Sequence, residues 1–130
     1  MTTTAYVDAS AVVKLVLDEP NSFEMQRWYT EADRVVTSRV GVVETMRATN
    51  RRAHDQAHLA TILDSIEVFE LDPAVAGVAA TLGPVLIRTL DAIHLATALA
   101  LVPDLDAFVT YDDRLAEAAR SLGLPVVRPA

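Results

Sequence analysis

Residues 5–10 read Ala5-Tyr6-Val7-Asp8-Ala9-Ser10, a short apolar run that ends in a carboxylate and leads directly into a helical pattern. A second stretch of this kind, Ala107-Phe108-Val109-Thr110-Tyr111-Asp112-Asp113, stands near the other end of the chain. Both runs predict buried β-strands. In an open parallel sheet, ligands bind in the crevice outside the carboxyl ends of the strands. Two carboxylates delivered there by different strands form a candidate site for a hard cation.

The rest of the chain alternates between strand and helix patterns, which favours an α/β fold with a central parallel sheet of four to five strands. The predicted strands are residues 5–7, 35–37, 68–71, 107–110 and 125–127. The predicted helices are residues 9–17, 22–32, 39 to about 53, 54–65 with a possible break near Asp55, 73 to about 82, 85 or 89 to 101, and 114–122. Ser38 and Asp72 are expected to cap the helices that follow them.

The bulk composition describes one compact domain, residues 1–130. A chain of 130 residues has the usual length of a single domain, and 52% of its residues are hydrophobic. Much of this content is Ala, Val and Leu, which suits helices packed on a sheet that is buried on both faces. The chain has no cysteine, so disulfides and thiolate metal sites are excluded.

No targeting or membrane segment is predicted. The N-terminus lacks a basic region before its apolar stretch, and Lys14 interrupts that stretch, so a signal peptide is not expected. The longest apolar run, residues 92–102, contains His94 and Thr97 and falls well short of the ~20 residues of a membrane span. We therefore expect a cytoplasmic protein with no membrane partner.

The net charge of −7 argues against a nonspecific nucleic-acid binder, because such proteins usually carry a basic surface. It is compatible with an enzyme whose acidic site is neutralised by divalent ions. The basic residues are ten arginines and one lysine, Lys14. Three of the arginines, Arg47, Arg51 and Arg52, are close in sequence, and arginine favours bidentate contacts with phosphate.

Each acidic residue of interest also has a purely structural interpretation. Four of them precede or open a helix and could serve as N-caps: Asp8, Asp91, Asp112 and Asp113. Glu44 lies within a predicted helix, with Arg47 and Arg51 three and seven residues later, as in a solvated salt-bridged stripe. Charges in apolar surroundings are expensive unless they are paired or bound to a cation. Since Glu44 and Asp91 stand in mostly apolar runs and two other acids end strands, capping alone does not explain the set.

The chain resembles the PIN-domain ribonucleases and, more narrowly, the VapC-type toxins of prokaryotic toxin–antitoxin pairs. The resemblance is carried, in order, by Asp8-x-Ser10-x-x-x-Lys14, an isolated Glu44 after an apolar run, Arg88-x-x-Asp91-x-x-His94-x-Ala96-x-Ala98, and Thr110-x-Asp112. These motifs span nearly the whole chain. Together they are specific for the fold and less specific for the RNA that is cut.

The resemblance implies a three-layer α/β/α domain and an endoribonuclease that depends on Mg²⁺ or Mn²⁺. Its catalytic, metal-binding residues would be Asp8, Glu44, Asp91 and Asp112. The hydroxyls of Ser10 and Thr110 would support the site, and Asp113 could supplement or replace Asp112. Divalent ions held by carboxylates can supply the nucleophilic water, neutralise the phosphoryl oxygens and stabilise the leaving oxygen. The resemblance also implies an RNA substrate, a homodimer and a cognate antitoxin.

Other residues have two competing interpretations. Arg47 and Arg51 could bind RNA phosphate. Lys14 could hold Asp8 or the phosphate, or could be a snorkelling surface residue. His94 is expected to be packed beside Asp91, not to bind metal. The helix that holds Met25, Trp28 and Tyr29 could turn them into the core or present them to a partner helix.

Two rival functions remain. A phosphatase of the haloacid-dehalogenase kind would carry a second Asp two residues after the first, where this chain has Ser10, and a receiver domain would carry a late lysine, which is absent. A non-catalytic scaffold on the same fold is the other alternative. Nucleotide hydrolysis by a P-loop is not expected, since all four glycines are isolated.

Overall fold

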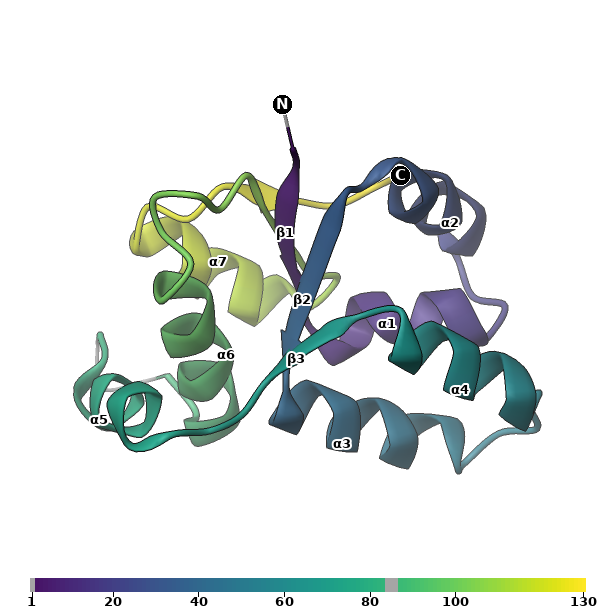
Figure 1. Ribbon diagram of the computed structural model, residues 1–130, viewed down its shortest axis with the longest axis horizontal. Helices are drawn as coiled ribbons and strands as arrows, with labels where there is room; N and C mark the ends of the chain where they lie inside the picture. Colours follow the sequence, from purple (N-terminus) through teal and green to yellow (C-terminus); the bar gives the residue numbers. More distant parts are fainter. Residues whose placement is uncertain (1, 84–86) are drawn as a thin grey trace.

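The computed structural model describes residues 2–83 and 87–130 and arranges them around one five-stranded parallel sheet (Figure 1). The strands are β1 (Thr4–Val7), β2 (Arg34–Ser38), β3 (Glu67–Phe69), β4 (Ala107–Val109) and β5 (Val126–Val127). Their order in space is β3-β2-β1-β4-β5, and every neighbouring pair is parallel. The predicted class and sheet are confirmed, and β1 is the central strand.

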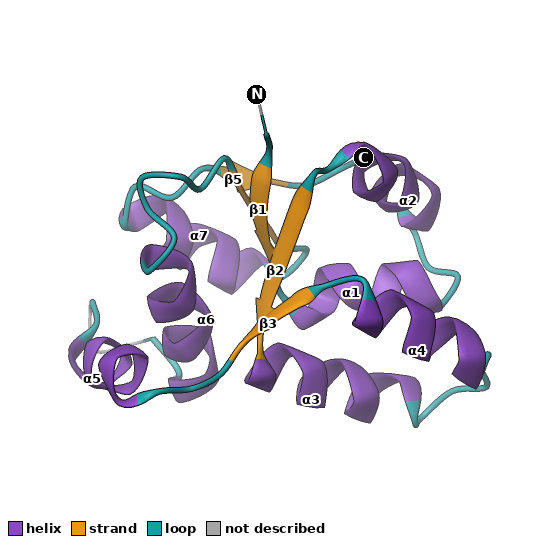
Figure 2. Cartoon of the chain, viewed as in Figure 1, coloured by secondary structure: helices purple, strands orange, loops and turns teal. Residues whose placement is uncertain are grey.

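Helices cover both sides of this sheet, which gives the three-layer α/β/α architecture (Figure 2). They are α1 (Ala9–Val16), α2 (Ser22–Glu31), α3 (Arg39–Thr49), α4 (Gln56–Asp64), α5 (Pro73–Thr81), α6 (Thr89–Leu99) and α7 (Asp113–Ser121). In the view of Figure 1, α1, α2 and α4 lie to the right of the sheet and α5, α6 and α7 to its left. Helix α3 contacts both α1 and α6.

The two layers of core follow from the alternation of side chains along the central strands. Ala5 and Val7 of β1 join the core beneath α1, whereas Tyr6 joins the core beneath α6 and α7. On that second face the ring of Tyr6 stacks on Phe108 of β4, with 5.3 Å between centroids. Because both faces of the sheet are covered by apolar side chains, the polar side chains of interest lie at the ends of the strands.

The carboxyl ends of the central strands bring distant residues together. Val7 pairs with Val109, so the residues that follow them, Asp8 and Thr110, become neighbours. The backbone N–H of Asp8 donates to the carbonyl of Val109 at 3.2 Å. Helices α1, α3 and α7 all begin at this edge, and the N-cap of α3 is Ser38, as predicted.

The structure corrects the predicted helix boundaries after α3. The helix expected to run to about residue 53 ends at Thr49, and α4 is a separate helix. The break has a local cause, because Oδ1 of Asp55 accepts hydrogen bonds from the N–H groups of Ala57 (2.9 Å) and His58 (3.1 Å) and starts a new helix there. The helix predicted to begin at residue 85 or 89 begins at Thr89, and residue 85 lies outside the described residues.

The apolar residues of α2 face inward. Met25 is fully buried, and Trp28 and Tyr29 pack against the same core, with the Tyr29 hydroxyl on Ser65. The core interpretation therefore accounts for all three side chains.

None of the helices in residues 2–83 and 87–130 combines the length and apolar character needed to cross a bilayer.

Candidate active site

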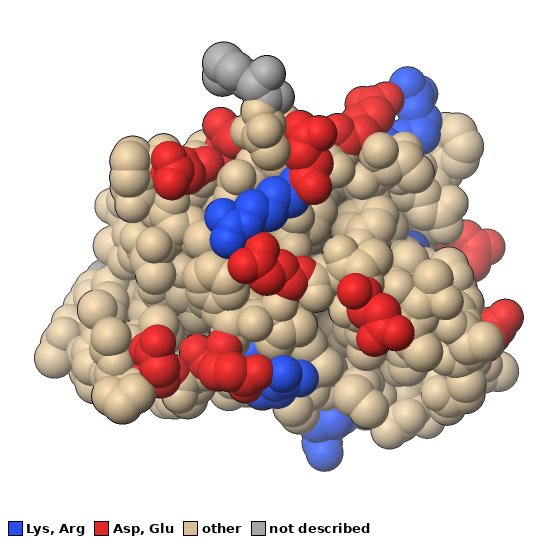
Figure 3. All heavy atoms as spheres, viewed as in Figure 1, with Lys and Arg blue, Asp and Glu red and all other residues tan. Residues whose placement is uncertain are grey.

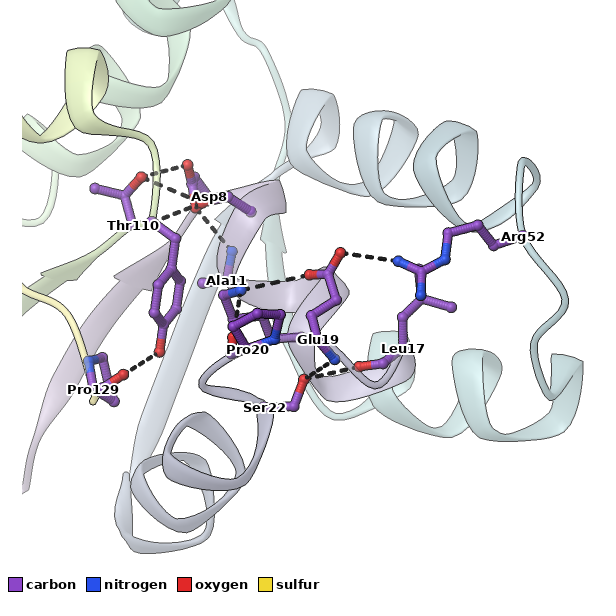
Figure 4. Close-up of polar contacts among 12 residues, drawn as sticks. Asp8, Ala11, Leu17, Glu19, Pro20, Ser22, Arg52, Thr110 and Pro129 are labelled. Carbon is purple, nitrogen blue, oxygen red and sulfur yellow. Dashed lines mark hydrogen bonds and ion pairs between the residues drawn. The ribbon is translucent and has the colours of Figure 1, made fainter.

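Asp8 is the most constrained acid at the carboxyl edge. It is 4% exposed and serves as the N-cap of α1, accepting from the N–H of Ala11 at 3.1 Å. Ser10 donates to its Oδ1 and Thr110 to its Oδ2, each at 2.7 Å. Figure 4 shows Ala11 and Thr110 approaching the carboxylate from different elements. Three donors on one buried carboxylate hold it in a single orientation.

The same surroundings perturb its ionisation. Burial raises the pKa of the Asp8 carboxyl above its ordinary value, and hydrogen bonds from Ser10 and Thr110 act in the opposite direction. The negative charge of Asp8 is therefore unfavourable in this buried position, even with its three hydrogen-bond donors. A cation close to Asp8 would relieve this penalty.

The hydroxyls of Ser10 and Thr110 also tie the loop after β4 to the start of α1. Ser10 Oγ accepts from the backbone N–H of Tyr111 at 2.8 Å, and Thr110 Oγ1 accepts from that of Asp112 at 3.0 Å. These two side chains thus link Asp8 to the segment that carries Asp112.

Asp91 lies in the first turn of α6 and its side chain is 21% exposed. Burial is the main cause that raises its pKa, and the negative charges of Asp112 and Glu44 raise it further. Arg88 opposes the shift from 3.9 Å away. These electrostatic effects mean that three of the predicted acids, from α3, α6 and the start of α7, share one neighbourhood.

Asp112 and Asp113 occupy different environments although they are adjacent. Asp112 caps α7, its Oδ1 accepting from the N–H groups of Arg114 (2.9 Å) and Leu115 (3.1 Å). The side chain of Asp113 is 89% exposed and pairs with Arg128 at 2.7 Å. Asp112 is therefore the member of the pair that belongs with Asp91.

Glu44 is held by a histidine. Nε2 of His94 lies 2.6 Å from Oε1 of Glu44, and Nδ1 of the same ring lies 2.6 Å from the hydroxyl of Tyr6. The expectation of a packed His94 is borne out by its 2% exposure, but its direct partner is Glu44 and not Asp91. Sequence spacing could not find this contact, which joins residues 50 positions apart.

The donor set suits a hard divalent cation, since it consists of carboxylates that repel one another and are partly desolvated. Within residues 2–83 and 87–130, no group of three or more His, Asp or Glu side chains is close enough to form a ready coordination shell. The side chains instead rest on local partners, such as the hydroxyls at Asp8 and the histidine at Glu44. The set therefore fits a divalent ion by its chemistry and its electrostatics. The carboxylates would have to move closer together to coordinate one.

Lys14 is turned away from the acids. Its Nζ donates to the carbonyl of Pro20 at 2.8 Å, pairs with Glu19 at 3.6 Å and lies 4.5 Å from the ring centroid of Tyr111. Glu19 in turn pairs with Arg52, as Figure 4 shows. The contacts of Lys14 thus stabilise the turn between α1 and α2.

Arg47 and Arg51 border the site on the side of α3. With Glu44 they line a groove of about 500 Å³ whose apolar part includes Val43 and Leu90. Neither arginine forms an ion pair with any other residue in the described part of the chain. Acidic side chains are prominent on the face shown in Figure 3, with a few Lys or Arg side chains among them.

A second groove, of about 620 Å³, lies on the other side of the first turn of α6. Asp91 lines it together with Arg88 and with Arg114 of α7. Sequence reasoning did not select Arg114, because the groove forms only when α7 packs beside α6. Glu44 and Asp91 therefore each line a groove that also contains arginines.

Comparisons with known proteins agree with this architecture. A family model described as the PIN domain matches residues 5–121. Two Mycobacterium tuberculosis proteins are each 39% identical to this chain: Ribonuclease VapC47 over 95% of this chain and 96% of its own length, and Ribonuclease VapC46 over 96% and 97%.

Two solved structures share the fold. One is M. tuberculosis VapC20, described as a Sarcin-Ricin loop cleaving toxin, with a TM-score of 0.73 and 19% identity over 96% of this chain and 99% of that one. The other is VapBC2 from Rickettsia felis bound to a DNA fragment from their promoter, with a TM-score of 0.72 and 12% identity over 98% and 100%. By the family match and the close relatives, the chain belongs to the PIN-domain family, within its VapC-type ribonucleases.

Proposed function

We propose that residues 1–130 form a single-domain endoribonuclease that depends on Mg²⁺ or Mn²⁺ and acts as the toxin of a toxin–antitoxin pair. The names of its relatives support ribonuclease activity. The observation that carries the proposal is the shared electrostatic neighbourhood of Asp91, Asp112 and Glu44 at the carboxyl edge, beside a buried Asp8. Such a set is unfavourable alone and suits a divalent ion.

The proposed metal ligands are Asp8, Glu44, Asp91 and Asp112, acting directly or through water. A divalent ion bound there would lower the pKa of a water and neutralise charge on the phosphoryl oxygens. The protein side chains hold the geometry. Ser10 and Thr110 orient Asp8, and the N-terminus of α7 orients Asp112. Asp113, paired with Arg128, would contribute only indirectly.

The proposed RNA path runs along the two grooves. Arg47 and Arg51 would bind phosphates on the Glu44 side, and Arg88 and Arg114 would bind them on the Asp91 side. Guanidinium groups suit this role because they can contact phosphate through two parallel hydrogen bonds. With Glu44 lining one groove and Asp91 the other, the scissile phosphate would lie near these acids. Lys14 is not part of this path, since its ammonium is engaged in the α1–α2 turn.

The proposed partner is an antitoxin that inhibits the site, and the isolated toxin is proposed to be a cytoplasmic homodimer. An arginine or lysine of the antitoxin would be attracted by the carboxylates and compete with metal for their oxygens. The apolar surface for an amphipathic segment would be the groove beside Glu44, where Val43 is 50%, Leu71 47% and Leu90 48% exposed. The helix α2 with Met25, Trp28 and Tyr29 is less suitable as a partner surface, because Met25 is buried and the other two pack against the core.

The acids are tested by amide substitution. Asp8→Asn, Glu44→Gln, Asp91→Asn and Asp112→Asn should each reduce metal-dependent RNA cleavage at least about 100-fold, since even residues behind metal ligands are worth 10–100-fold. Asp113→Asn should have a much smaller effect. The matched control is Asp55→Asn, which alters the N-cap of α4 and lines neither groove. Cleavage that persists in EDTA or in Asp8→Asn would refute the proposal.

Alanine substitutions of the groove arginines test the proposed RNA path. Arg51→Ala and Arg114→Ala should each raise KM several-fold with little change in kcat and lower the slope of log affinity against log salt by about 0.7 per lost phosphate contact. Arg52→Ala is the control, because Arg52 is adjacent to Arg51 but pairs with Glu19. If both groove variants match the control in KM and salt dependence, these arginines are only solvated surface groups.

The toxin assignment is tested in cells. Expression of the chain alone should arrest growth, and co-expression with a small neighbouring gene should relieve the arrest and yield a stable complex. Leu71→Ser should weaken that complex more strongly than it weakens RNA cleavage, because it removes apolar contact area without adding a charge to the proposed RNA path. Harmless expression together with no complex would exclude the toxin role while leaving the nuclease role open.

A further inference from the structure

A buried hydrogen-bonded chain connects the core of the sheet to the acid site. It runs from Tyr6 in β1, which is fully buried, through His94 in α6, which is 2% exposed, to Glu44 in α3. Both links are 2.6 Å long. The Glu44 side chain is 31% exposed, so the chain ends at the rim of the site.

The chemistry of the three groups fixes the direction of the link to Glu44. A carboxylate can only accept, so Nε2 of His94 must carry the hydrogen of that bond. Burial raises the pKa of Tyr6, so its phenol keeps its proton and can donate to Nδ1 of His94 when that nitrogen carries no hydrogen. Nε2–H then donates to Oε1 of Glu44. The other carboxylate oxygen, Oε2, accepts no hydrogen bond from residues 2–83 or 87–130.

The packing of α3 against α6 preserves this contact. Gly41 lies one turn before Glu44, and a Cβ at this position would lie 3.5 Å from Cε1 of His94 and would collide with the hydroxyl of Thr37. That hydroxyl is buried and donates to the carbonyl of Val7 at 2.7 Å, so it has little freedom to move. A glycine here lets α3 approach closely enough for Glu44 to reach the histidine.

A histidine that merely satisfies its own polar atoms in a core needs no ionisable partner at the rim of a site. His94 also lies on α6 one turn after Asp91, so its ring reaches Glu44 from the helix that carries another proposed ligand. The orientation of Glu44 is thus linked to Tyr6, the core residue of β1 whose ring stacks on Phe108 of β4.

We propose that His94 is a positioning residue for Glu44, held in turn by Tyr6, and this inference rests on the proposed function. By holding Oε1, the histidine fixes the flexible glutamate and leaves Oε2 to the metal. Partners behind metal ligands act in this way: they orient the ligand, and their loss weakens metal binding about 10–100-fold.

The test compares substitutions in the full-length protein. His94→Leu removes the donor, His94→Gln can still place an amide N–H toward Glu44, and Tyr6→Phe removes only the phenol hydroxyl. His58→Leu is the control, because His58 is exposed and, among residues 2–83 and 87–130, its Nε2 hydrogen-bonds only to the carbonyl of Leu15. The readouts are Mn²⁺ affinity by electron paramagnetic resonance, kcat and KM for RNA cleavage, and ¹⁵N spectra of the histidine rings.

We expect His94→Leu to lower Mn²⁺ affinity and kcat at subsaturating metal about tenfold or more, with KM for RNA nearly unchanged. Tyr6→Phe should give a smaller loss of the same kind, and His94→Gln should recover most of the affinity. The ring spectrum of the wild type should show a proton on Nε2 of His94.

Wild-type Mn²⁺ affinity and kcat in folded His94→Leu, or a neutral ring protonated only on Nδ1, would overturn the positioning role while the nuclease assignment stands. If His94→Leu does not fold, wild-type Mn²⁺ affinity and kcat in Tyr6→Phe would overturn it equally. If the wild-type protein neither binds Mn²⁺ nor cleaves RNA, the proposed function and this inference fail together.

Discussion

The buried carboxylate of Asp8 is the constraint on which the rest of the site depends. It ends the central strand, caps α1 and accepts hydrogen bonds from two hydroxyls, one on its own helix and one on the loop after β4. The pairing of Val7 with Val109 makes this convergence unavoidable. The strand order thus determines which residues meet at the carboxyl edge, and Asp8 joins them into one framework.

Burial of the carboxylates is the physical reason to propose a counter-ion for this framework. Burial raises the pKa values of Asp8 and Asp91, so both carboxylates ionise at a cost to the folded state. For an acid with a raised pKa in the folded protein, stability is highest below its unfolded pKa of about 3.9 and is lost as the pH rises through the folded value. The ionised site is therefore least favourable near neutral pH without a cation, and the proposed metal would stabilise the folded protein most under that condition.

The sequence predicted the elements that depend on local patterns. Alternating apolar runs gave the strands, and the capping roles of Ser38 and Asp72 followed from their positions before helices. Features that depend on tertiary packing were missed. The His94–Glu44 contact requires α3 to cross α6, and the groove at Arg114 requires α7 beside α6. Lys14 is spaced as the family motif requires, yet its ammonium turns to Pro20, which only the loop conformation reveals.

The most direct test of the account is thermal unfolding of the wild-type protein and Asp8→Asn near neutral pH, each in EDTA and in Mg²⁺. We predict that Asp8→Asn is at least as stable as the wild type in EDTA, since its amide keeps the capping acceptor without the buried charge. Mg²⁺ at 100 times its Kd should stabilise the wild type by about 2.7 kcal/mol and the variant far less. A strongly destabilised Asp8→Asn in EDTA, with no effect of Mg²⁺ on the wild type, would make Asp8 a structural cap and contradict the account.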